Sequence, residues 1–227
     1  MEYQVLSVVI PAHNSEAYIA DAIDSVFRQQ HGEVEVIVVD DGSTDGTQAA
    51  LARFGSRIRV LVQENKGPAC ARNAGIRAAK GSLIGLLDAD DLWTDDHVGA
   101  MLPYLEEDSH YDLVRGRTRT VQLGDSEAGN NPDEAFQPAL VGACLFRASV
   151  FETVGLFNER MRQGEDADWN IRFAESACEE KRIDRTVLIY RRHSGSAADS
   201  PEAIKRGLMD AIRNKLARAP AVRCTPQ

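Results

Sequence analysis

The stretch Leu83-Ile84-Gly85-Leu86-Leu87-Asp88-Ala89-Asp90-Asp91 joins an apolar run of strand length to three carboxylates within four positions. An apolar run without alternating polar residues is typical of a strand that is buried on both faces of a parallel sheet. The acids then lie at the carboxyl end of that strand, which is the edge where open α/β sheets bind their ligands. Like charges this close raise one another's pKa unless a cation or hydrogen-bond donors neutralise them. The stretch therefore predicts a central strand with an anionic site at its end.

Two interpretations of these acids are open. Oxygen ligands suit Mg²⁺ or Mn²⁺, and such ions are commonly held by one or two carboxylates together with water and substrate phosphate. The alternative is that Asp90 or Asp91 caps a helix that begins near Thr94 or Asp95, which leaves the other acids solvated.

The rest of the chain predicts an α/β fold. Strands are expected at residues 5–10, 34–39, 58–62 and 83–87, each followed by a helix, at 15–30, 45–54, 68–79 and 95–105. This alternation predicts right-handed crossovers and a mostly parallel, Rossmann-like sheet flanked by helices. After residue 111 the expected elements are strands at 113–123, 140–146 and 183–190, and helices at 148–154, 165–177 and 201–217. A mobile surface loop, long enough to act as a lid, is expected at 124–138.

Size and composition restrict the class of protein. The 227 residues fit one large α/β domain. The net charge of −9 argues against nucleic acid as a partner. No apolar run is long enough for a transmembrane segment, and the four cysteines show neither a C-x-x-C spacing nor a preceding secretory leader. We therefore expect a soluble cytoplasmic protein with free thiols, and a homo-oligomer is compatible with the sequence.

A second apolar strand also ends in acids, among them Asp41. A carboxylate at that edge can accept a hydrogen bond from a pyrimidine N–H or from ribose hydroxyls, and Gly42 would let the backbone approach a flat base. The alternative is a turn at this point, with Ser43 or Thr44 capping the next helix. His13, which follows the first strand, could stack on a base or lie solvated in its loop.

Two later clusters add further polar groups. Glu165 and Asp166 lie at the expected start of a helix, where the helix dipole favours acids whatever their role. A carboxylate there can also act as a general base, and the two side chains project about 100° apart, so only one needs to face a cleft. Arg192 and His193 follow the last strand and could bind a diphosphate, with His193 as an added metal ligand. The alternative is a solvated basic loop.

Taken in chain order, these segments resemble the inverting family-two glycosyltransferases, which have the A-type nucleotide-diphosphosugar transferase fold. The resemblance covers residues 6–196, and its specificity comes from the order of the motifs. They are Val8-Val9-Ile10-Pro11-Ala12-His13-Asn14, Val38-Val39-Asp40-Asp41-Gly42-Ser43-Thr44-Asp45, Asn65-Lys66-Gly67-Pro68-Ala69-Cys70-Ala71-Arg72-Asn73, Leu87-Asp88-Ala89-Asp90-Asp91, Val154-Gly155-Leu156-Phe157-Asn158-Glu159 and Gly164-Glu165-Asp166. A departure is His13, where many relatives carry a tyrosine.

The resemblance implies a role for individual residues. Nucleotide binding is expected of Pro11, Ala12, His13, Asn14, Asp41, Lys66, Arg72, Asp88 and Ala89, with Asp41 at the uracil. The divalent ion, Mn²⁺ or Mg²⁺, is expected on Asp88 and Asp90. His193 is expected as a further metal ligand and Arg192 at the diphosphate, while Asp166 is the expected catalytic base with Glu165 beside it. The implied reaction is the inverting transfer of a hexose from a UDP-sugar to a hydroxyl of a saccharide, a lipid-linked sugar or a peptide.

The expected organisation is a single glycosyltransferase domain over residues 1–217. It comprises a nucleotide-binding half (1–110), an acceptor-binding half (111–200) and a C-terminal helix (201–217), followed by a tail (218–227). A sugar nucleotidyltransferase would need a glycine-rich basic loop after the first strand, and a dinucleotide oxidoreductase would need G-x-G-x-x-G there; Pro11-Ala12-His13-Asn14 offers neither. The remaining alternative is a non-catalytic sugar-nucleotide-binding module, against which the acids at 88, 90 and 166 favour an enzyme.

Overall fold

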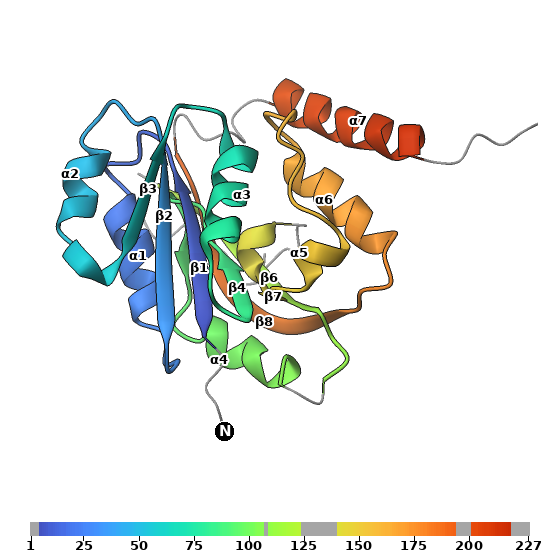
Figure 1. Ribbon diagram of the computed structural model, residues 1–227, viewed down its shortest axis with the longest axis horizontal. Helices are drawn as coiled ribbons and strands as arrows, with labels where there is room; N and C mark the ends of the chain where they lie inside the picture. Colours follow the sequence, from blue (N-terminus) through green and yellow to red (C-terminus); the bar gives the residue numbers. More distant parts are fainter. Residues whose placement is uncertain (1–4, 107–108, 124–139, 194–200, 219–227) are drawn as a thin grey trace, which may run out of the picture.

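A single sheet of eight strands forms the centre of the computed structural model, which describes residues 5–106, 109–123, 140–193 and 201–218 (Figure 1). The strands run in the order β3-β2-β1-β4-β7-β6-β8-β5. Their bounds are β1 Leu6–Ala12, β2 Val34–Asp41, β3 Arg59–Gln63, β4 Leu83–Leu86, β5 Leu92–Trp93, β6 Leu113–Gln122, β7 Cys144–Arg147 and β8 Glu180–Arg192. Strand β4 has β1 and β7 as neighbours, so the predicted central position of the 83–91 stretch is confirmed.

Helices cover both faces of the sheet (Figure 1). They are α1 Ile19–Phe27, α2 Thr47–Ala52, α3 Pro68–Ala78, α4 His97–Met101, α5 Val150–Thr153, α6 Glu165–Ala174 and α7 Pro201–Arg218, with short 3₁₀ turns η1 Gly55–Arg57, η2 Leu102–Tyr104 and η4 Val141–Ala143. The predicted mostly parallel α/β class is confirmed: β1 pairs in parallel with β2 and β4, β2 with β3, and β6 with β8. Only β7 and β5 run antiparallel to their neighbours in this sheet.

Several expected elements differ in their bounds, for example α1, which spans Ile19–Phe27 rather than the expected 15–30. The helix expected at 95–105 is the short α4 followed by a 3₁₀ turn, because Pro103 cannot donate a backbone hydrogen bond there. The strand expected at 140–146 begins as the η4 turn, and the last strand extends to Arg192. Neither Asp90 nor Asp91 caps α4, whose preceding residue is Asp96. The loop expected at 124–138 lies outside the described residues.

The two faces of the sheet bury separate apolar cores. Successive side chains of a strand point to opposite faces, so Val8 belongs to the first core and Val9 to the second. The first core receives α1, whose buried residues Ile19, Ala22, Ile23 and Val26 follow helical spacing. In the second core, Trp169 of α6 is surrounded by aromatic rings of Phe146, Phe151, Phe157 and Phe173. Helix α6, which begins at the two candidate catalytic acids, is therefore anchored in the second core.

Candidate active site

The polar loops that follow β1, β2, β3 and β4 meet at the carboxyl edge of the sheet, because these four strands are parallel neighbours. Hydrogen bonds between backbone and side chain connect the loops after β1 and β2: the Asn14 side chain accepts the N–H of Thr44 at 2.8 Å, and the Asn14 N–H donates to Ser43 Oγ at 3.0 Å. Asn14 has a φ of 49°, a left-handed conformation that asparagine tolerates better than most residues. The edge expected to hold the ligand is thus a continuous set of loops.

Arg72 of α3 is the centre of the site, since its guanidinium contacts three carboxylates. Its Nη2 lies 2.6 Å from Asp88 Oδ1, and its Nη1 lies 2.7 Å from Glu165 Oε1 and 3.3 Å from Asp166 Oδ1. Burial opposes its charge, but the three carboxylates hold the pKa of Arg72 well above its ordinary value. Because only 5% of the side chain is exposed, these contacts are weakly screened by solvent. Arg72 therefore joins the end of β4 to the start of α6.

Glu165 and Asp166 both turn toward Arg72, whereas the sequence required only one of them to face the site. The longer Glu165 side chain reaches the same Nη1 and is 9% exposed, against 22% for Asp166. Burial raises the pKa of Asp166 to about 7; Arg72 opposes this rise, and the nearby charges of Glu165 and Asp88 add to it. A carboxylate that titrates near neutrality has the basicity that a general base needs at physiological pH.

Asp90 and His193 are also brought together, as the sequence predicts. His193 Nε2 lies 3.1 Å from Asp90 Oδ2, and its ring lies against Tyr18 with 4.4 Å between ring centroids. Burial, followed by the charge of Asp88, raises the pKa of Asp90. Asp91 has a different position: its Oδ1 accepts the backbone N–H of Arg191 at 3.0 Å, so this acid attaches β8 to the β4 loop.

The donor set at Asp88 and Asp90 is compatible with a divalent ion. Their side chains are 36% and 33% exposed, so an ion and a ligand can reach their oxygens. Within the described part of the chain, no group of three or more His, Cys, Asp or Glu side chains is arranged to hold a metal. Mg²⁺ commonly uses one or two carboxylates and takes its other ligands from water and phosphate, so two acids suffice.

Asp41 is buried at the other end of the site and binds the loop after β3. Its Oδ1 accepts hydrogen bonds from the Lys66 N–H at 2.9 Å and from Gln63 at 2.7 Å, and its Oδ2 accepts one from the Gly67 N–H at 2.7 Å. His13 Nδ1 lies 2.9 Å from the Asp41 carbonyl oxygen, which makes Nδ1 the protonated nitrogen. Lys66 and His13, two of the expected nucleotide-binding residues, therefore lie beside Asp41.

Two details of this loop region differ from what the sequence predicts. Neither Ser43 nor Thr44 caps α2; Asp45 instead accepts the N–H of Thr47 at 3.0 Å. Gly42 has a φ of 71°, and a Cβ there would lie 2.8 Å from the backbone nitrogen of Asn65. The close approach that requires glycine is thus made by the neighbouring loop of the chain itself.

The partners of some polar residues around the site are not predicted by the sequence. Buried Arg115 of β6 donates to Asn170 Oδ1 at 2.6 Å, and Asn170 in turn donates to the Asp166 carbonyl oxygen at 2.7 Å. Arg191 donates to the Asp90 carbonyl oxygen at 2.5 Å and to Asp21 at 3.1 Å. The only signal in the sequence is arginine within an otherwise strand-like run, which implies buried acidic or carbonyl partners.

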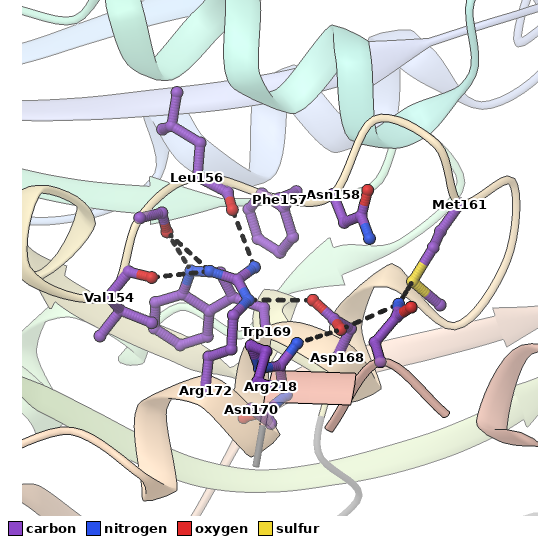
Figure 2. A network of polar contacts seen from close by, with 12 residues as sticks. Val154, Leu156, Phe157, Asn158, Met161, Asp168, Trp169, Asn170, Arg172 and Arg218 are labelled. Carbon is purple, nitrogen blue, oxygen red and sulfur yellow. Dashed lines mark hydrogen bonds and ion pairs between the residues drawn. The ribbon is translucent and has the colours of Figure 1, made fainter. Parts of the chain in front are cut away.

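A polar network holds α6 in place behind the site (Figure 2). Asp168, with 1% of its side chain exposed, lies 2.9 Å from Arg172 and 3.2 Å from Arg218 of α7. Arg172 also donates to the carbonyl oxygens of Val154 at 2.7 Å and Leu156 at 2.8 Å. These contacts fix α6 against the 154–156 loop and against α7, so the acids in its first turn have a rigid support.

Comparison with known proteins identifies the family of this chain. The model of glycosyl transferase family 2 matches residues 7–152, about two thirds of the sequence. The chain belongs to glycosyl transferase family 2. The matched region contains Asp41, Arg72, Asp88 and Asp90, whereas Glu165 and Asp166 lie beyond it. The resemblance inferred from the sequence motifs is therefore confirmed.

The curated relatives of this family 2 chain are longer than the chain itself. It is 33% identical over 173 residues to an uncharacterized glycosyltransferase of Rickettsia felis, covering 71% of the chain and 29% of that relative. It is 31% identical over 220 residues to the uncharacterized glycosyltransferase EpsJ of Bacillus subtilis, covering 87% of the chain and 64% of EpsJ. The chain thus spans less than two thirds of either relative.

Solved structures share its fold. Residues 1–349 of S. aureus TarS, determined in complex with UDP-GlcNAc, align with a TM-score of 0.72 at 22% identity, over 93% of this chain and 66% of that one. The mannosyltransferase PcManGT from Pyrobaculum calidifontis, in complex with GDP-Man and Mn²⁺, aligns with a TM-score of 0.75 at 19% identity, over 97% and 66%. These similarities confirm the A-type fold. Among the described helices of the family 2 chain, none has the length and apolarity required to cross a bilayer.

Proposed function

We propose that this protein is an inverting glycosyltransferase that moves a hexose from a UDP-sugar to an acceptor hydroxyl, with Asp166 as the general base. The observation that carries the proposal is the convergence of Asp88, Glu165 and Asp166 on the buried guanidinium of Arg72. Arg72 thereby connects Asp88, at the end of β4, with Asp166, whose pKa is raised. In this proposal residues 1–110 bind the nucleotide and residues 111–200 bind the acceptor.

The proposed step is a single displacement at the anomeric carbon. The acceptor oxygen forms the new bond to this carbon while its proton passes to Asp166. The bond from the anomeric carbon to the phosphate oxygen breaks, and its electron pair leaves with the nucleoside diphosphate. Attack opposite the leaving group inverts the configuration. General-base assistance of this kind is typically worth about 10²–10⁴ in rate.

Charge develops on the departing diphosphate and needs stabilisation at the other side of the reacting carbon. Asp88 and Asp90 would hold Mn²⁺ or Mg²⁺, which when bound supplies positive charge to the diphosphate oxygens. His193 lies 3.1 Å from Asp90 and is proposed as a further ligand, and Arg192, the last residue of β8, is proposed to bind the diphosphate. Arg72 holds Asp88 and Asp166 within one cluster, so it positions the two ends of the reaction relative to each other.

The nucleoside is proposed to lie over the loops that contain Pro11, Ala12, His13, Asn14 and Asp41. The support is geometric: His13 is exposed at this edge and hydrogen-bonds to the Asp41 carbonyl, while Lys66 is held beside it. Asp41 already accepts three hydrogen bonds from the chain, which leaves at most one lone-pair direction of its two oxygens for a uracil N–H. TarS was determined with UDP-GlcNAc and PcManGT with GDP-Man, so the two structures support a nucleotide-sugar donor, and the choice of uridine rests on Asp41.

A screen for slow hydrolysis of nucleotide sugars tests this proposal, because it needs no knowledge of the acceptor. We expect turnover of a UDP-sugar with Mn²⁺ or Mg²⁺, no turnover with EDTA, and at least a hundredfold loss in Asp166→Asn. Thermal stabilisation by UDP should likewise be larger with Mn²⁺ than with EDTA and should lose this difference in Asp90→Ala.

The alternative function, a non-catalytic sugar-nucleotide-binding module, gives a different result in the same screen. Nucleotides would stabilise the protein, yet no donor would be hydrolysed and Asp166→Asn would change nothing. Preferential stabilisation by GDP would contradict the uridine assignment while leaving the transferase intact.

A further inference from the structure

One face of α7 exposes apolar side chains to solvent. Ile204, Leu208, Ile212 and Leu216 recur every four residues and are 39% to 67% exposed, and Met209 beside them is 45% exposed. Residues at this spacing lie on one side of a helix. We call these five residues the α7 stripe. Exposed apolar side chains that gather in this way mark an interaction surface more often than single exposed ones do.

The α7 stripe is not the face by which α7 holds to the protein. Gly207 and Ala211 are buried on the side of α7 that faces α6, and a Cβ on Gly164 would lie 2.5 Å from the Gly207 backbone. Ion pairs fasten the far end of the helix: Arg218 lies 3.2 Å from Asp168. Figure 1 shows α7 at the periphery of the molecule, lying across α6. The outward direction of the stripe is therefore fixed by the fold.

The charge of α7 is opposite to that of the whole chain. Residues 201–218 contain five Lys or Arg and two Asp or Glu, a net charge of +3, whereas the chain carries −9. Lys205, Arg206 and Arg213 are all exposed. At about 100° per residue, Arg206 and Arg213 border the stripe on the side away from α6. Lys205 lies near the start of the stripe, where its aliphatic stem can contact an apolar surface while its ammonium reaches a polar one.

The size of the stripe argues against a protein partner. An 18-residue helix is about 27 Å long, so a stripe about 10 Å wide offers on the order of 300 Å². A stable protein interface buries about 800 Å² on each partner. A second copy of the chain would in addition bring two cationic helices together, and these repel. A lipid surface requires neither matched shape nor a second protein, and anionic headgroups attract basic side chains that flank an apolar face.

We propose that α7 docks this protein on an anionic lipid bilayer. The α7 stripe enters the boundary between headgroups and acyl chains, with the helix parallel to the surface, while Arg206 and Arg213 contact lipid phosphates. This inference rests on the exposed face of α7 alone, and its outcome is independent of whether the protein transfers sugars.

Vesicle flotation of the purified full chain tests the proposal. Vesicles of phosphatidylcholine are compared with vesicles that also contain phosphatidylglycerol, at low and at high salt. We expect binding to the anionic vesicles that weakens with salt. The triple variant Leu208→Gln, Ile212→Gln, Leu216→Gln should lose at least about a hundredfold in partitioning. The double variant Arg206→Gln, Arg213→Gln should lose about fivefold for each charge removed.

The matched control is Val60→Gln, Val62→Gln, which replaces two side chains of β3 that are 39% and 65% exposed at the far edge of the sheet. It should bind anionic vesicles as the wild type does. Failure of the wild type to bind anionic vesicles would overturn the proposal, as would equal losses in the control and the triple variant. A dimer in solution that the triple variant abolishes would assign the stripe to a second copy instead.

Discussion

Replacing His97 by phenylalanine should flatten the dependence of folding stability on pH. His97 is fully buried and stacks on Trp93, with 3.7 Å between ring centroids and 11° between planes. Its Nδ1 lies 3.0 Å from the carbonyl oxygen of Val187, so Nδ1 carries the proton of the neutral ring. Its Nε2 is buried and has no hydrogen-bond partner within the described residues. Burial lowers the pKa of His97 to about 3, against a smaller opposing effect of the Val187 hydrogen bond.

The size of this pH dependence follows from the protonation of His97 in the unfolded chain and in the folded protein. The unfolded chain binds a proton on this ring below its ordinary pKa of 6.5, whereas the folded protein does not until about 3. The contribution of neutral His97 to stability is therefore complete above 6.5 and is lost as the pH falls from 6.5 toward 3. At about pH 5 the loss amounts to about 2 kcal/mol.

Urea unfolding at about pH 7.5 and about pH 5 measures this loss. His97→Phe keeps a ring over Trp93 but loses one hydrogen bond, which costs about 1 kcal/mol at either pH. Its decrease in unfolding free energy between the two pH values should be about 2 kcal/mol smaller than that of the wild type. His110→Gln, which removes a histidine that is 66% exposed, is the control and should behave like the wild type. If His97→Phe loses as much stability as the wild type on acidification, the buried neutral histidine is not the cause.

The remaining predictions concern the site and its support. In the wild type kcat/KM should fall about tenfold per pH unit below about 7, because protonation of Asp166 removes the base. In Asp166→Asn kcat/KM should be at least a hundredfold lower and independent of pH in this range. A wild-type kcat/KM that does not fall below about pH 7 would exclude Asp166 as the base. Asp166→Asn should be at least as stable to unfolding as the wild type at alkaline pH, because burial disfavours the charged carboxylate of Asp166 and the variant removes that charge. Asp41→Ala should lower the melting temperature as well as UDP affinity, because it leaves the N–H groups of the loop after β3 without their acceptor; unchanged melting would contradict the loop-binding role. Asp168→Leu should lower the free energy of unfolding in urea by about 3–5 kcal/mol, because it leaves Arg172 and Arg218 without their shared carboxylate. A decrease below about 1 kcal/mol would show that solvent replaces this carboxylate.

The regular part of the fold is predictable from sequence because local and tertiary preferences agree there. The strands β1, β2 and β4 are apolar runs that are buried on both faces, and α1 shows the helical spacing of its buried side. Strand β5 is different: its two residues are ordered by pairing with β8, and Trp93 occupies the space left by the missing side chain of Gly85. A two-residue strand of this kind has no local signal, because its partner is almost a hundred residues away in the chain.

The same distinction separates the predictable and unpredictable parts of the candidate site. The acids at 88 and 90 follow a parallel strand, so their position at the carboxyl edge of the sheet could be predicted from topology. The pair at 165 and 166 follows a helix and a loop, so only the family resemblance connected it with the site. The roles of Arg72 and Arg191 depend on partners about a hundred residues away, such as Glu165 for Arg72 and Asp91 for Arg191. Sequence alone also could not show that Glu165 and Asp166 meet at one guanidinium, since that depends on where α3 lies relative to α6.

The chain contains only two tryptophans, and the sheet separates them. Trp93 belongs to the core on one face and Trp169 to the core on the other, and both are almost fully inaccessible to solvent. Intrinsic fluorescence therefore reports on the two halves of the interior separately. The variants Trp93→Phe and Trp169→Phe each retain one tryptophan. Their fluorescence shows whether the α1 side and the α6 side of the sheet unfold in a single cooperative transition or one after the other. Because each tryptophan lies on one side of the sheet, an equilibrium unfolding titration followed by fluorescence measures whether the two sides unfold cooperatively.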